Sequence, residues 1–198
     1  MKSKDLFLTQ SYDKLMNAIH AIPDEVATDI YALSFFYYAE EDDPRFPSIE
    51  VSYNTTEQYK KETAKASDET EAQWNYAFWL QEAIEKIGGA ADKSLQQWFK
   101  ETPYYYSEAE NEAAEEDDEL FDKLLEQGGN FETEFTESII SLARKLFKEN
   151  IIEKKFGKDI PIIIHELEYY DQPVAWTQKA NKPGLIEPFI AAYESGKL

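Results

Sequence analysis

The sequence contains no cysteine, which excludes disulfide bonds and thiolate metal sites and is compatible with a reducing compartment. No apolar run approaches the ~20 residues that a membrane-spanning helix needs. The first 15 residues, MKSKDLFLTQSYDKL, also lack the apolar core of a secretory signal. These absences together predict a soluble protein of the cytoplasm.

Basic residues are scarce, because 20 lysines and arginines stand against 40 aspartates and glutamates, a formal net charge of −20. This charge disfavours binding to nucleic acid phosphates and to anionic membranes, so we expect neither partner. Aromatic residues make up 15 % of the chain, whereas disordered chains are poor in them. We therefore expect a globular protein, with residues 1–198 forming a single domain.

The acidic excess is concentrated in one segment. Residues 101–140 contain 14 acidic side chains and a single base, Lys123. Eight of these acids fall within twelve residues: Glu108, Glu110, Glu112, Glu115, Glu116, Asp117, Asp118 and Glu119. A solvated helix face normally interleaves such acids with lysine or arginine at i,i+4 spacing. Three interpretations stay open: a partly disordered segment, a surface for a cationic partner, or a weak site for a cation such as Ca²⁺.

Three consecutive tyrosines, Tyr104, Tyr105 and Tyr106, stand directly before the acidic run. Tyrosine is enriched at protein interfaces because it combines apolar area with a polar tip. The alternative is that these side chains pack on the core. We predict that they flank an acidic face, within an acidic helical segment that covers about residues 104–130.

Hydrophobic patterning predicts an α+β fold. Residues 30–38 and 48–54 alternate as two strands of a hairpin around a charged turn. Residues 160–169 and 174–178, joined by a turn at 170–173, predict a second hairpin. The expected architecture is an antiparallel sheet built from two hairpins, with helices packed on it and a long helical connection between the hairpins.

The remaining segments show helical spacing. An apolar face predicts a helix over residues 5–21, and Gly88-Gly89 is expected to end a helix that begins near Ser67. Shorter helices are expected around residues 95–99 and after Pro183. The apolar stripe of Leu120, Phe121, Leu124 and Leu125 predicts a helix that stops at Gly128-Gly129, and a separate helix is expected over residues 132–148.

No motif for enzymatic chemistry is present: there is no cysteine nucleophile, no G-x-S-x-G and no glycine-rich phosphate loop. The one histidine–carboxylate cluster contains His165, Glu166 and Glu168. On a strand the two glutamates share a face, so we expect them in water and His165 in the core beside Ile163 and Leu167. We therefore predict no catalytic residue, no metal ligand and no cofactor. The alternative is an enzyme with a divalent metal held by Glu166 and Glu168.

Three stretches carry a resemblance to known proteins: IYALSFFYYAEEDDPRFPSIEVSYNT, ASDETEAQWNYAFWL and PIIIHELEYYDQPVAWTQKAN. They resemble a family of uncharacterised bacterial domains that is grouped with the immunity proteins of polymorphic toxin systems, near the cell-wall-assembly-regulator-like immunity class. The resemblance covers most of the chain and brings no catalytic residue with it. It implies an intracellular binding protein more than an enzyme.

Charge and resemblance favour the same hypothesis, a non-catalytic cytoplasmic protein that neutralises a basic toxin through the acidic face and its tyrosines. Toxins that cut nucleic acid need basic surfaces to hold phosphates. Clustered carboxylates would steer association with such a surface. A structural or regulatory adaptor, in which the charge serves solubility, is the remaining alternative.

Overall fold

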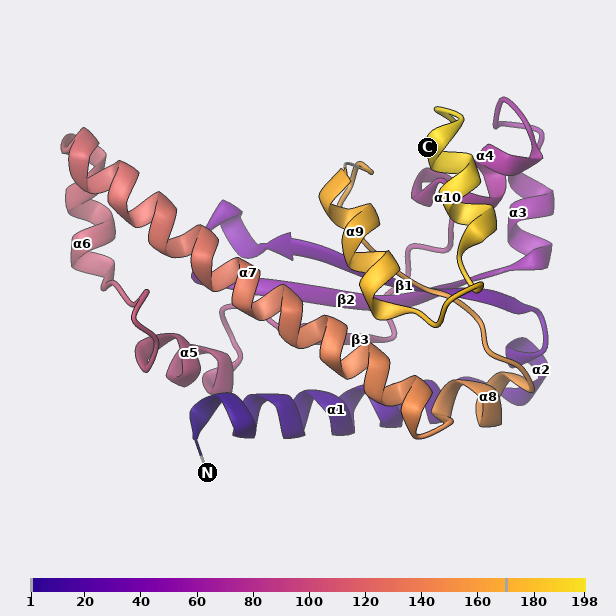
Figure 1. Cartoon of the computed structure of the whole chain (residues 1–198), viewed down its shortest axis with the longest axis horizontal. Helices are drawn as coiled ribbons and strands as arrows, with labels where there is room; N and C mark the ends of the chain where they lie inside the picture. The colour runs from indigo at the N-terminus through magenta and orange to yellow at the C-terminus, as the bar shows by residue number, and fades with distance from the viewer. Residues whose placement is uncertain (1, 170) are drawn as a thin grey trace.

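A mixed β-sheet forms the centre of the computed structural model, which describes residues 2–169 and 171–198 (Figure 1). Its strands are β1 (Ile30–Ala39), β2 (Pro47–Thr55), β3 (Glu85–Gly88) and β4 (Ile162–His165), in the spatial order β3-β2-β1-β4. β2 is antiparallel to both β1 and β3, whereas β4 is parallel to β1. The predicted α+β class and the first hairpin are confirmed.

The inner strand β1 is buried on both faces, which explains why its sequence is apolar throughout. Leu33, Phe35 and Tyr37 belong to the larger core cluster, and Ala32 and Phe36 to a smaller cluster on the opposite face. Helices that contribute to the larger cluster include α1 (Ser3–Ala21), α5 (Lys93–Lys100), α7 (Asp118–Lys148) and α8 (Ile151–Phe156). The smaller cluster is completed by α4 (Glu69–Trp74) and α10 (Glu187–Glu194).

The short connecting helices are α2 (Asp24–Ala27), α3 (Thr56–Glu62) and α6 (Glu108–Ala113). The predicted helices over residues 5–21, around 95–99 and after Pro183 are confirmed as α1, α5 and α10. Among the described helices, none is both long and apolar enough to cross a membrane.

The predicted second hairpin is wrong, because residues 174–178 lie in a helix, α9 (Asp171–Ala180). Pro173, Trp176, Thr177 and Ala180 are all buried, and their spacing is that of one helical face. The first residue of the predicted turn, Tyr170, lies outside the described residues. A short apolar run satisfies strand and helix patterns equally well, so the local sequence did not distinguish the two.

Side chains of α9 and the residue after it replace the missing strand at the outer edge of β4. The N–H of Ile164 donates to Thr177 Oγ1, and the Thr177 hydroxyl donates to the carbonyl of Ile164, both at 2.9 Å. Asn181 makes the same pair of hydrogen bonds with Ile162. Its Oδ1 accepts from the N–H of Ile162 at 2.9 Å, and its Nδ2 donates to the carbonyl of Ile162 at 2.7 Å. The strand edge is thereby closed, so further strand pairing is unnecessary.

The helix expected from Ser67 to Gly88-Gly89 is also wrong. Its cap is Asp68, α4 ends at Trp74, and the chain then passes through a 3-10 turn (Tyr76–Phe78) into β3. Trp74 is buried in the smaller cluster and Ile87 in the larger one. The apolar residues of this segment therefore pack on opposite faces of the sheet. Residues on one face of a single helix could pack on only one of them.

α7 continues through Gly128-Gly129, where the sequence predicted a stop, and joins the two expected helices into one of 31 residues. A Cβ on Gly128 would lie 2.4 Å from Cγ of Pro44, in the β1–β2 turn. Apart from the backbone of α7 itself and the residues next to Gly129 in the chain, no described atom lies within 4 Å of the corresponding position at Gly129. Gly128 thus permits close approach of the turn to the helix, whereas Gly129 has no such role.

This pair of glycines gives a matched prediction. We expect Gly129→Ala to raise the free energy of unfolding by about 1 kcal/mol, because alanine has the higher helix propensity and meets no neighbour. Gly128→Ala should lower it by about 1 kcal/mol, because the clash with the rigid Pro44 ring exceeds that gain. Urea unfolding of the two variants measures both values. Equal effects of the two substitutions would contradict the close approach of turn and helix.

Candidate functional site at the acidic end

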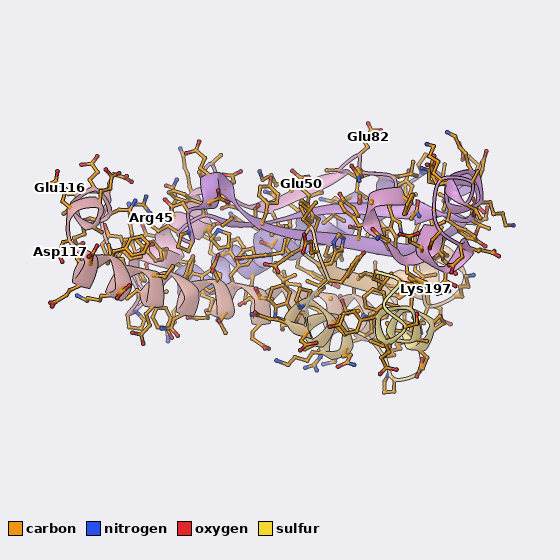
Figure 2. The ribbon with its side chains drawn as sticks, turned by 90° about the horizontal axis from the view of Figure 1, so that it is seen from above. Arg45, Glu50, Glu82, Glu116, Asp117 and Lys197 are labelled. Atoms are coloured by element: carbon orange, nitrogen blue, oxygen red, sulfur yellow. The ribbon has the colours of Figure 1, made fainter. Side chains whose placement is uncertain are left out.

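The predicted acidic face lies at one end of the molecule, far from the end that carries α10 (Figure 1). It comprises α6, a 3-10 turn (Ala114–Glu116) and the first turn of α7. Residues 104–107 are not part of a helix, contrary to the predicted helical segment, and instead form a turn and an irregular lead-in to α6. Figure 2 shows Glu116 and Asp117 at the tip of this end, with Arg45 set inward of them.

Three of the eight predicted acids have structural roles within this end. Glu108 forms an ion pair with Nη1 of Arg45 at 2.8 Å. Glu110 and Ser107 form a capping box at the start of α6, in which hydrogen bonds from Ser107 lower the pKa of Glu110. Asp117 caps α7 by accepting from the N–H of Leu120 at 3.1 Å. These contacts fix the backbone on which the other acids are displayed.

The other five acids are exposed, and their side chains make no hydrogen bond or ion pair with any residue that the structure describes. They are Glu112, Glu115, Glu116, Asp118 and Glu119. Like charges held this close on short helical turns repel one another and weaken the local helix. Their placement on a capped scaffold is therefore a cost to stability that a cationic partner would relieve.

The three tyrosines have different environments. Tyr106 is buried against Phe99, with ring centroids 5.5 Å apart, and burial raises the pKa of its hydroxyl to about 12. Tyr104 is half-buried and packs against the larger core cluster. Tyr105 is 42 % exposed and presents its ring at the surface. Tyr105 is thus the tyrosine best placed to contact a partner, while Tyr106 supports the site from below.

Arg45, from the β1–β2 turn, ties this end to the sheet although it is only 6 % exposed. Its Nε donates to both carboxylate oxygens of Asp43 at 2.9 Å. Its guanidinium also lies over the rings of Phe46 and Tyr106, at 5.3 and 5.5 Å from their centroids. The hydrogen bonds that Arg45 donates to Asp43 and its pairing with Glu108 raise the pKa of Arg45, so the cation is permanent.

The same turn brings a second group of acids to this end, which sequence reasoning treated only as a charged connection. Glu41 and Asp42 are exposed and have left-handed backbones, with φ of 55° and 57°. Neither side chain pairs with another described residue. Gly128 seats Pro44 against α7, which holds the turn next to the acidic helices. In the sequence, the run EEDD shows that acids are clustered in this turn. Only the contact between Pro44 and Gly128 places that turn next to the acidic helices.

Among the described residues, the structure does not bring ligands together around Glu166 and Glu168. β4 ends at His165, so Glu166 and Glu168 lie beyond the strand, and Glu166 is half-buried near Glu132 instead. Burial raises the pKa of Glu166, and repulsion from Glu132 raises it further. Within the described ranges, no three histidine, aspartate or glutamate side chains are grouped to hold a metal ion.

His165 packs in the core beside Ile163, as expected, whereas Leu167 is 75 % exposed, contrary to expectation. His165 Nδ1 lies 2.8 Å from the carbonyl of Glu166, which can only accept, so this nitrogen carries the proton. Nε2 therefore accepts from Ser34 Oγ at 2.8 Å. The pair has the spacing of a nucleophile and its base, but both residues are fully buried, and substrate has no access to them.

Comparisons of the chain with protein-family models, with curated proteins and with solved structures found no match.

Proposed function

We propose that the protein binds a basic partner protein through its acidic end and, in line with the resemblance described above, acts in the cytoplasm as an immunity protein against a basic toxin. The observation that carries the proposal is the set of exposed carboxylates without side-chain partners, displayed on a capped and ion-paired scaffold. Such preorganised charge steers association with a cationic surface and selects against anionic ones.

The two acidic groups support this proposal in different ways. The helical acids Glu112 to Glu119 supply the charge, and Glu41 and Asp42 extend it onto the adjacent turn. The buried serine–histidine pair and the absence of a metal-binding group among the described residues give no support to the enzymatic alternative.

A charge-reversal variant tests the proposal. Glu115, Glu116, Asp118 and Glu119 are exposed and without side-chain partners, so replacing all four with lysine should leave the fold intact. The expected result is a loss of affinity for the basic partner of about 100-fold at low ionic strength, mostly through the association rate. The partner is first captured from the native cells at low salt, identified, and then titrated as a purified protein.

A matched variant controls for overall charge. Asp13, Glu82, Glu153 and Glu194 are equally exposed, lie outside the acidic end, and give the same change in net charge when replaced with lysine. This control should retain most of the affinity. Equal losses in the two variants would overturn the site. Co-expression then tests the immunity role: a partner that is not toxic when expressed alone would favour the adaptor alternative.

A further inference from the structure

The acidic end contains a cleft of about 350 Å³ between the β1–β2 turn, α6 and α7. Apolar side chains form much of its wall: Pro44, Tyr106, Ala114, Phe121, Leu124 and Leu125. An apolar stripe such as the one at residues 120–125 of α7 normally anchors a helix in the core. Leu124 does so, but Phe121 and Leu125 are 53 % and 58 % exposed.

Exposed apolar area is concentrated here rather than scattered. Among the described residues, the large hydrophobic side chains that are exposed are Leu6, Tyr105, Phe121, Leu125 and Leu167. Phe121 and Leu125 are one helical turn apart and line the same cleft, and Tyr105 lines the neighbouring hollow. Grouped apolar exposure inside a polar rim marks an interaction surface, whereas isolated exposed side chains do not.

The rim of the cleft determines the chemistry of its occupant. Glu41, Asp42 and Glu115 line it, and their side chains make no hydrogen bond or ion pair with another described residue. No lysine or arginine lines the cleft, and Asp43, the remaining carboxylate, is paired with Arg45. An acidic peptide or a nucleic acid would be repelled, whereas a segment with cations beside an apolar side chain matches both wall and rim.

We propose that this cleft takes a basic amphipathic helix of the partner protein, with a large apolar side chain seated against Phe121 and Leu125 and with lysine or arginine beside the rim carboxylates. This is the helix-in-groove mode of recognition. The inference rests on the proposed function and deepens it. Charge governs the approach of the partner, and the apolar wall governs how long the complex lasts.

The test uses a synthetic helical peptide of lysine and leucine, about 14 residues or roughly four turns long. Two matched peptides accompany it, one with serine in place of leucine and one with glutamate in place of lysine. Binding to the full chain is followed by fluorescence anisotropy. We expect the lysine–leucine peptide to bind at least tenfold more tightly than the serine version, and the glutamate version not to bind.

Two protein variants locate the contact. Phe121→Ser/Leu125→Ser removes the apolar wall without changing the charge, and Leu6→Ser/Leu167→Ser removes two exposed apolar side chains elsewhere. The first variant should lose at least tenfold in affinity for the lysine–leucine peptide, mainly through faster dissociation, and the second should match the wild type. Circular dichroism checks that both variants keep their helices.

The outcomes separate this inference from the proposed function. Unchanged binding by Phe121→Ser/Leu125→Ser, together with loss of binding in the four-lysine variant, would overturn the cleft and leave the acidic end as a purely electrostatic site. If the variant with lysine at positions 115, 116, 118 and 119 bound the basic partner as tightly as the wild type does, the proposed function itself would be overturned. Failure of the lysine–leucine peptide to bind the wild type would also overturn the cleft.

Discussion

Lowering the pH from 7 to 5 is expected to remove about 2 kcal/mol from the free energy of unfolding through one side chain, His165. Burial lowers the pKa of His165 from 6.5 to about 4 in the folded protein. Below pH 6.5 the unfolded chain binds a proton that the folded chain rejects, so acidification favours unfolding. The full effect, reached as the pH falls through 4, is about 3 kcal/mol, from ~1.4 kcal/mol for each pKa unit.

The surroundings of His165 compensate only slightly for a buried cation. Its ring lies 4.5 Å from that of Tyr76 and 5.5 Å from that of Tyr169, measured between centroids. Ser34 and the carbonyl of Glu166 are its hydrogen-bond partners, and both are neutral groups. The carbonyl raises the pKa slightly, but desolvation is the larger effect.

Comparison with His165→Gln isolates this contribution, because glutamine retains an amide for hydrogen bonding and does not titrate. The variant should be less stable than the wild type at pH 7, but should lose about 2 kcal/mol less between pH 7 and pH 5. Glu132 and Glu166 have raised pKa values and act in the opposite direction, and they cancel because both proteins contain them. Parallel pH profiles of the two proteins would contradict a neutral buried His165.

The parts of this fold that the sequence predicted are those determined by local patterns. The apolar face of α1 and the alternation of β1 and β2 are regular over many residues, so period alone distinguishes helix from strand. Residues 174–178 are too few for that distinction. The side chains that close the edge of β4, Thr177 and Asn181, are not recognisable as such until the strand is in place.

The candidate site likewise has one part that the sequence predicted and one part that it did not. Its helical acids form one continuous run in the sequence, so composition was enough to find them. Glu41 and Asp42 are more than sixty residues away along the chain, and the approach of Pro44 to Gly128 brings them into the same site. The glycine that was interpreted as a helix stop is the residue that permits this contact. Sequence spacing contains no signal for such a pairing.

Replacing Arg45 with methionine is expected to lower the free energy of unfolding by about 2 kcal/mol. Methionine keeps most of the apolar packing on Phe46 and Tyr106, but the Asp43 carboxylate, which is largely buried, loses its ion pair. Glu108 contributes little to this cost, because it is 65 % exposed and water replaces the guanidinium there. Accordingly, Glu108→Gln should cost only about 0.5 kcal/mol.

Arg45→Lys serves as the control for charge, because lysine is a point cation that cannot reproduce the paired donors that reach Asp43 and Glu108. It should recover only part of the stability that the methionine variant loses. Hydrogen exchange should show that α6 opens faster in Arg45→Met than in the wild type. The opening rate in Arg45→Lys should lie between those two. If Arg45→Lys recovered all of the stability that Arg45→Met loses, the positive charge alone, and not the paired donors of the guanidinium, would hold the acidic end to the sheet.

The same substitution separates preorganised charge from diffuse charge in partner binding. Arg45→Met makes the acidic end more negative by one unit, so a binding mode that depends on charge alone would become tighter at low ionic strength. If the carboxylates act because Arg45 holds α6 against the turn, affinity for the lysine–leucine peptide should fall instead, through faster dissociation. We expect the fall, because Arg45 joins the turn that carries Glu41 to Glu108 at the start of α6, and α6 leads directly into the 3-10 turn that carries Glu115.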